Sequence, residues 1–165
     1  MKPLYLLLIA IALSFSSNAQ IEGASRLYGY KQAVLPGTIR TDDNGNPMQH
    51  RRQFNYFIYI ASSSRVTPVE IWINGEVNPV TAVKIATPVE YKNPTSLENK
   101  SKTLVPKTSK KVLQLNASAK KVEKPTQKGK LLSTKNELVI IYKCNGKLYY
   151  KAISKLEELA PVAMQ

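Results

Sequence analysis

The chain has little of what most enzyme and metal sites depend on. Its 165 residues include a single cysteine, Cys144, and a single histidine, His50. One cysteine excludes an intrachain disulfide, and one cysteine with one histidine cannot supply the four protein ligands of a structural zinc site. Packing must therefore stabilise the folded state. Because Cys144 lies inside an apolar run, we expect it to be buried rather than reactive.

Catalytic arrangements are equally scarce. A serine triad would need His50 between a carboxylate, such as Asp42 or Asp43, and one of the serines at positions 62–64. No nucleophile-elbow sequence surrounds those serines. Two arginines follow His50 directly, which favours an exposed loop histidine. A catalytic pair of Cys144 and His50, as in a cysteine protease, is a still weaker candidate, because no activating motif surrounds the cysteine.

The acidic residues select no site either. The spacing of Glu70, Glu76, Glu90 and Glu137 singles out no pair for glycoside hydrolysis, and we interpret Glu70 and Glu76 as solvent-facing strand residues. The loop at 42–46 lacks the spacing of a calcium-binding hand and is interpreted as a turn. We therefore predict no enzyme, no catalytic residue, no cofactor and no metal. A hydrolase of unknown type is the third and weakest alternative.

Long apolar runs are confined to the N-terminus. Lys2 precedes an apolar stretch from Leu4 to Phe15, and Ser17-Asn18-Ala19 forms a small-residue cleavage site followed by Gln20. This pattern is typical of a cleaved export signal, and the stretch is shorter than the roughly 20 residues of a bilayer span. We expect a signal peptide over 1–19, cleavage near Ala19-Gln20, a periplasmic or secreted protein, and no stable membrane insertion. The remaining 146 residues fit one domain.

Acidic and aromatic residues are almost absent from the middle of the chain. Residues 92–135 contain 12 lysines, two glutamates, no arginine and no aromatic residue. Such a composition buries too little apolar surface to offset the entropy of ordering it. We expect a lysine-, serine- and threonine-rich, partly ordered insertion, in which Leu104-Val105 and Val112–Leu115 are possible short strands.

Two interpretations of these lysines stay open. They are a solubilising tract, or they capture an anionic envelope glycan or lipid headgroups, with Lys110, Lys111, Lys120 and Lys121 as candidate contacts. Specific phosphate recognition usually involves arginine, and single-stranded nucleic acid requires aromatic platforms. Because both are missing and the protein is expected to be exported, nucleic acid is not a predicted partner.

The flanking segments alternate with the period of β-strands. Phe54, Tyr56, Ile58 and Ile60 lie at period two, and the opposite face is also apolar, which predicts a strand over 52–60 that is covered on both sides. A first strand is expected over 26–34. Val69, Ile71 and Ile73 mark another, followed by a two-residue turn at Asn74-Gly75 that returns the chain as residues 77–85. Pro79 predicts that this returning strand lies at an edge or contains a bulge.

The clearest local feature is a second hairpin. Residues 138–144 and 147–153 flank Asn145-Gly146, which places Cys144 opposite Lys147, Tyr142 opposite Tyr149, and Ile141 opposite Tyr150. Ser154 heads a capping box that predicts one helical turn, ended by Pro161, with frayed residues beyond. The fold class predicted is all-β, a small antiparallel β-sandwich or open barrel with the long lysine-rich insertion and at most a short C-terminal helical turn.

Aromatic residues are the best candidates for binding. Alternation leaves some of the tyrosines facing outward, and Trp72 lies opposite the Ile71 and Ile73 face, so it points to solvent or to the insertion. We take Trp72, Tyr149 and Tyr150 as candidate contacts for a partner. The leading hypothesis is an exported, non-enzymatic β-domain that binds another envelope protein through strand edges or aromatic faces. The alternative is binding of anionic glycan or lipid, which salt would weaken.

Overall fold

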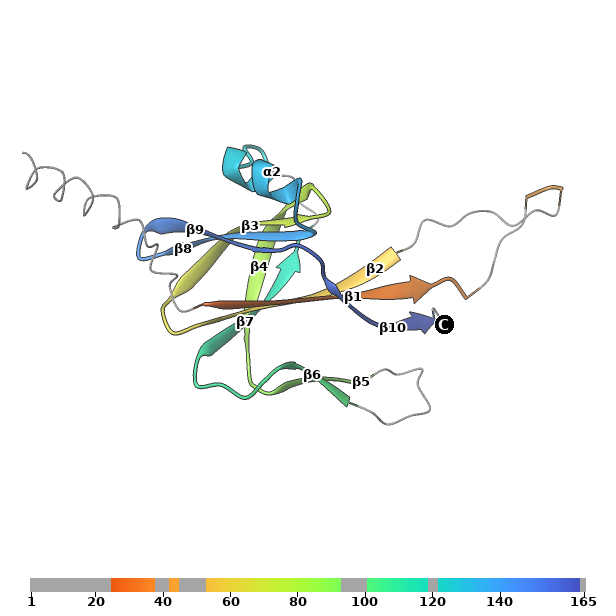
Figure 1. Cartoon of the computed structure of the whole chain (residues 1–165), viewed down its shortest axis with the longest axis horizontal. Coiled ribbons are helices and arrows are strands. Elements are labelled where there is room, and N and C mark those ends of the chain that lie inside the picture. Colours follow the sequence, from red (N-terminus) through yellow and green to blue (C-terminus); the bar gives the residue numbers. More distant parts are fainter. Residues whose placement is uncertain (1–24, 38–41, 45–52, 93–100, 119–121, 164–165) are drawn as a thin grey trace, which may run out of the picture.

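The computed structural model describes residues 25–37, 42–44, 53–92, 101–118 and 122–163 (Figure 1). The predicted signal peptide, His50, Lys120 and Lys121 lie outside these residues. Within them the chain forms a strongly curled, eight-stranded half-barrel sheet, a two-stranded sheet and one short helix. The elements are β1 (Arg26–Leu35), β2 (Gln53–Ser62), β3 (Val66–Ile73), β4 (Glu76–Ile85), β5 (Val89–Lys92), β6 (Ser101–Val105), β7 (Lys111–Ala117), α2 (Gln127–Ser133), β8 (Leu138–Cys144), β9 (Lys147–Ile153) and β10 (Glu157–Ala163).

The large sheet curls because β4 changes partner along its length. The strand order is β10-β1-β2-β7-β4-β3-β8-β9. The first half of β4 pairs with β3, with Trp72 opposite Val77, and the second half pairs with β7, with Ala82 opposite Leu115. This bend folds β3, β8 and β9 over β1, β2 and β7, so that the two parts face each other (Figure 1). The all-β, open-barrel prediction is confirmed.

Three apolar clusters divide the molecule into layers. The main core lies inside the half-barrel and includes Ile60, Ile71, Ile140 and Cys144. The hairpin of β5 and β6 covers a second cluster on the outer side of β1, β2 and β7, and α2 covers a third on the outer side of β3 and β8 (Figure 1). The predicted burial of Cys144 is confirmed at 6% exposure.

The locally encoded elements form as predicted. Both hairpin turns have positive φ at each turn residue, 50° and 84° at Asn74 and Gly75, and 50° and 77° at Asn145 and Gly146. The cross-strand pairs predicted for β8 and β9 are present. β2 lies between β1 and β7, and its second half is covered on both faces, because Ile60 faces the main core and Tyr59 the second cluster.

The edge position predicted from Pro79 is wrong. β4 lies in the interior of the sheet, between β3 and β7. Pro79 is the last residue paired with β3, opposite Glu70, and pairing with β7 begins at Val80. Its carbonyl oxygen accepts a hydrogen bond of 2.8 Å from the Ser118 N–H. The missing N–H therefore falls where the strand changes partner, and it interrupts neither ladder.

Residues 92–135 contribute ordered elements to every layer. β7 is an interior strand of the large sheet, where Leu115 is 1% exposed and pairs with Ile58. β6 carries Leu104 and Val105 into the second cluster, which agrees with the short strands expected there. Over 101–117 and 127–133 these strands and α2 stand where composition predicts a mostly solvated tract.

The C-terminus forms a strand instead of the predicted helical turn. β10 pairs with β1, with Tyr30 opposite Glu157 and Leu35 opposite Ala163, so the residues after Pro161 do not fray before Ala163. This pair is parallel, which makes the sheet mixed rather than purely antiparallel. The capping-box pattern does not start a helix here, because the strand conformation buries Leu159, 5% exposed, in the second cluster. An edge strand tolerates Pro161.

Candidate functional site

The large sheet opens between the first half of β2 and the end of β7. β2 pairs with β1 from Gln53 to Ala61, but with β7 only from Ile58 to Ser62. β7 pairs with β4 from Val112 to Ala117, but its last two residues, Asn116 and Ala117, have no partner on β2. Within the described structure, the backbone of 53–57 therefore has a strand on one side only. This wedge is an unpaired sheet edge inside an otherwise continuous sheet.

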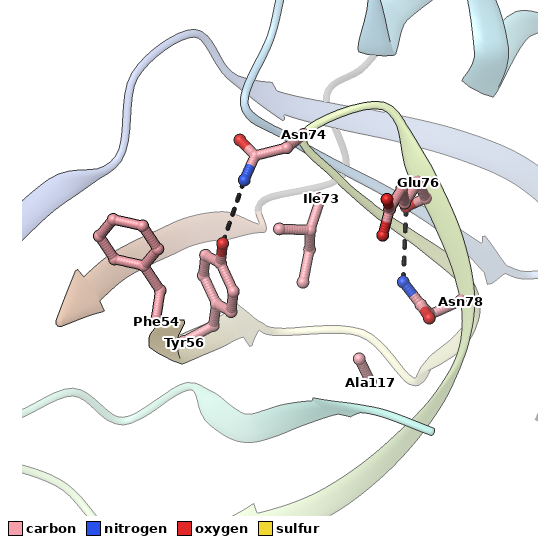
Figure 2. A pocket seen from close by; sticks show the side chains of 7 residues that line it. All are labelled: Phe54, Tyr56, Ile73, Asn74, Glu76, Asn78 and Ala117. Carbon is pink, nitrogen blue, oxygen red and sulfur yellow. Dashed lines mark hydrogen bonds between the residues drawn. The ribbon is translucent and has the colours of Figure 1, made fainter. Parts of the chain in front are cut away.

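A pocket of about 440 Å³ lies in this wedge. Phe54 and Tyr56 form one wall, and Ile73 and Asn74 at the β3–β4 turn face them (Figure 2). A second opening of about 440 Å³ shares this wall and runs along the backbone of β2 and β7. Together the two form a groove, which we call the β2–β7 groove. It is lined by Phe54, Asn55, Tyr56, Phe57, Ile58, Ile73, Asn74, Glu76, Asn78, Gln114, Leu115, Asn116 and Ala117.

Hydrogen bonds and rings fix the walls of the groove. Asn74 Nδ2 donates to the Tyr56 hydroxyl at 3.0 Å, which ties the β3–β4 turn to β2 (Figure 2). The rings of Phe54 and Tyr56 lie 6.4 Å apart, and Lys31 Nζ lies 5.7 Å from the centre of the Phe54 ring. Burial raises the pKa of the Tyr56 hydroxyl, and the bond from Asn74 opposes this shift. Tyr56 is therefore a neutral hydrogen-bonding group at physiological pH.

The lining of the groove is mostly aromatic, aliphatic and amide side chains. Its lining residues include no histidine, cysteine, serine or lysine, and Glu76 is their one charged group. Amide side chains at Asn78, Gln114 and Asn116 offer both donors and acceptors. No group of three or more potential metal ligands occurs among the described residues. Aromatic walls, amides and open backbone are the features of a recognition site.

The aromatic candidates lie away from the groove and are packed. Trp72 is 4% exposed and lies under α2. It thus points to the 92–135 segment, the second of the two predicted directions. The ring of Tyr149 stacks on Tyr142 at 5.8 Å and packs against the main core. Tyr150 is half-buried, with Lys128 Nζ 4.6 Å from the centre of its ring. The structure therefore places Trp72 and Tyr150 in the third cluster, whereas Tyr149 packs on the opposite face of the sheet against the main core.

The lysine candidates that can be placed lie at the other end of the sheet. Lys110 and Lys111 are exposed where β7 begins, opposite the end of β2. His50, interpreted as an exposed loop histidine, lies outside the described residues. Asp42 Oδ1 accepts a 2.9 Å bond from the Asn44 N–H, which makes an exposed turn.

The interpretation of Glu70 as a solvent-facing residue is wrong, whereas Glu76 is exposed as expected. Glu70 is 4% exposed and accepts hydrogen bonds of 3.1 Å from Trp72 Nε1 and from the Thr126 N–H. The Thr126 hydroxyl adds a third bond at 3.1 Å. Glu70 is buried because it anchors the first turn of α2, which covers this face of the sheet.

Sequence reasoning missed the groove because its residues have ordinary structural explanations. Phe54 and Tyr56 alternate with Ile58 and Ile60 in a strand predicted to be covered on both sides, and Asn74 belongs to a predicted turn. The early divergence of β2 from β7 depends on pairing between distant segments, for which the sequence has no local signal.

No family model matches the chain, and neither a curated protein nor a solved structure shows significant similarity to it. Among the described residues, no helix is long and apolar enough to cross a membrane.

Proposed function

We propose that this protein is an exported, non-enzymatic β-domain that binds an extended segment of another envelope protein in the β2–β7 groove. The observation that carries the proposal is the unpaired side of β2 over 53–57, next to a pocket. The N–H and C=O groups of a strand edge are complementary to another extended backbone. The incoming segment would lie beside β2 and extend the sheet.

The pocket supplies side-chain selectivity. Alternate residues of an added strand point to the same side, so one of them enters the space between Tyr56 and Ile73. The walls favour an apolar or aromatic side chain, and Asn74 and Asn78 at the rim suit a polar neighbour. With Glu76 as its one charged lining group, the groove does not depend on charge attraction. Binding should therefore persist in high salt.

Other strand edges are less suited to this role. β9 and β10 are the outer strands of the large sheet. β9 carries Lys147 and Lys151, and β10 carries Pro161, features with which proteins protect edges from pairing. The first half of β2 contains neither lysine nor proline. Among the described edges, it is the one without such protection.

Site-specific photo-crosslinking tests the proposal. A photoreactive residue at Asn116, on the rim of the groove, should crosslink to an envelope protein at low and at high salt. The same residue at Val83, 54% exposed on the neighbouring strand, is the matched control and should not. The crosslinked segment, made as a synthetic peptide, should protect amide protons within 53–57 from exchange.

A blocking variant completes the test. Ala117→Trp fills the pocket from its exposed base and should abolish peptide binding, whereas Val83→Trp adds the same ring elsewhere and should not. A peptide that binds equally well to A117W, or that leaves residues 53–57 unprotected, would refute strand addition at this site. A crosslink to a second copy of the chain would replace the envelope partner by a homodimer.

A further inference from the structure

Basic residues gather at the end of the half-barrel opposite the groove. The pairing register places Lys111 opposite Ser62, and Lys84 opposite Leu113, so the ends of β2 and β4 meet at the start of β7. Arg65 lies in the turn from β2 to β3. β3 then pairs with the end of β8, which pairs with the start of β9, with Cys144 opposite Lys147.

These strand ends form one basic surface, which we call the basic end. The β2–β3 and β8–β9 turns lie together on the left of Figure 1. The side chains that belong to the basic end are all exposed: Arg65, Lys84, Lys111, Lys143 and Lys147. The described segments 62–67, 83–87, 107–113 and 142–148 contain no aspartate or glutamate. These segments therefore bring positive charge and no carboxylate to this end of the half-barrel.

An exposed apolar side chain lies among these charges. Leu148 is 42% exposed and stands directly opposite Lys143 in the β8–β9 ladder. Next to it in sequence is Lys147. An apolar side chain among lysines is suited to a bilayer interface, where the apolar group enters the headgroup region and the ammonium groups meet lipid phosphates. A soluble anionic polymer would offer Leu148 nothing to enter.

The chain also enters the described structure at this end. The Ser25 hydroxyl lies 2.7 Å from the Tyr142 hydroxyl, two residues before Cys144. The first described residue of the chain therefore lies at the basic end.

We propose that the basic end binds the surface of a bilayer that contains anionic lipids. Five charges on strand ends and turns suit a field of phosphates, for which no paired hydrogen-bond geometry is needed. The β2–β7 groove, at the opposite end, then faces away from the membrane. Both surfaces can be occupied at the same time, and the membrane proposal does not depend on the groove.

Vesicle co-sedimentation tests the proposal. The chain beginning at Gln20, which retains every described residue, is mixed with phosphatidylglycerol–phosphatidylcholine vesicles and, separately, with pure phosphatidylcholine vesicles. We expect binding to the anionic vesicles alone, and its loss as ionic strength rises from 0.1 to about 0.5 M. Binding to neither vesicle, or equally to both, would overturn the proposal.

Matched variants locate the surface. Each cation removed from a membrane-facing surface should weaken binding about fivefold, so K143S/K147S should lose roughly 30-fold. K130S/K135S removes the same charge from α2 and from the second residue after it, and should lose less than about threefold. Equal losses in the two double variants would show an effect of net charge alone, which contradicts a specific basic end.

Leu148→Ser separates a bilayer from other polyanions. It leaves the charge unchanged, so binding to dextran sulfate should be unaffected, whereas binding to anionic vesicles should weaken several-fold. If L148S binds vesicles as tightly as the parent chain, or if the parent binds dextran sulfate and not vesicles, the bilayer is the wrong partner. Unchanged thermal unfolding in each variant confirms that the loss is local.

Discussion

The buried carboxylate of Glu70 gives the sharpest prediction about stability. Replacing it by alanine removes the acceptor for Trp72 Nε1, the Thr126 N–H and the Thr126 hydroxyl, each at 3.1 Å. A hydrogen bond to a charged group contributes about 1.5–3 kcal/mol, but three bonds to one carboxylate are not additive. Water can reach some of the freed donors once α2 loosens. We expect Glu70→Ala to lower the free energy of unfolding by about 3 kcal/mol.

The effect should be visible locally as well as globally. Trp72 is the one tryptophan of the chain, and it is buried under α2. In E70A its fluorescence should shift to longer wavelength before the global transition, because loss of the anchor lets α2 detach. Thermal unfolding should move down by roughly 10 °C for a domain of this size. Glu70→Gln, which keeps one acceptor oxygen, should fall between E70A and the parent chain.

The matched control is Glu76, an exposed carboxylate on the neighbouring strand β4. Glu76→Ala should change the free energy of unfolding by less than about 0.5 kcal/mol and leave the emission of Trp72 unchanged. The reasoning fails if E70A has the emission spectrum and the urea midpoint of the parent chain. It also fails if E70A and E76A are destabilised equally.

Three further predictions follow from close packing and charge. Gly129→Ala should lower the free energy of unfolding by about 1–3 kcal/mol despite the better helix propensity of alanine, because the added Cβ would lie 2.5 Å from Trp72 Nε1. Lys130→Ala, on the exposed side of α2, should change it by less than about 0.5 kcal/mol, and urea unfolding measures both. Burial alone would raise the pKa of Glu137, but hydrogen bonds from the Leu156 N–H and Lys31 hold it below the ordinary value of 4.5. The charged carboxylate therefore stabilises the fold above that pH, and this contribution is lost as pH falls through the lowered pKa. Glu137→Gln should accordingly flatten the fall of the urea midpoint below about pH 5. Cys144, 6% exposed, should react with a thiol reagent only at the rate of unfolding; fast reaction in the folded state would contradict its place in the core.

Local pattern was sufficient for much of the fold. The two Asn-Gly turns fix their hairpins because both turn residues must adopt positive φ, and few residues other than asparagine and glycine do so readily. β2 was recognisable because both faces of an interior strand are apolar. The burial of Cys144 could be predicted because the residue lies in an apolar strand.

The remaining elements depend on partners that local pattern does not specify. β7 is interior because it pairs with the second half of β2 and with the second half of β4. Its lysine-rich surroundings conceal this role, so a deletion of 92–135 would remove an interior strand and would not test the lysines alone. The segment from Ser154 onward carries a helix-start pattern, but parallel pairing with β1 places Leu159 in the second cluster. Tertiary packing here overrides local propensity.

The candidate site was hidden for the same reason. Nothing at Phe54 or Tyr56 distinguishes a groove wall from a core position until the register with β7 is known to begin at Ile58. Glu70 was misread because strand alternation alone predicts a solvent face where α2 packs. In both cases the decisive neighbours are more than 50 residues away in sequence.

Photo-crosslinking from position 116, with and without A117W, tests the central claim most directly. The account predicts a salt-resistant crosslink from position 116 to an extended segment of another protein. This crosslink should be lost in A117W and retained in V83W. It should be absent when the photoreactive residue is placed at position 83 instead. The same crosslink from both positions, or one that survives in A117W, would contradict binding in the β2–β7 groove.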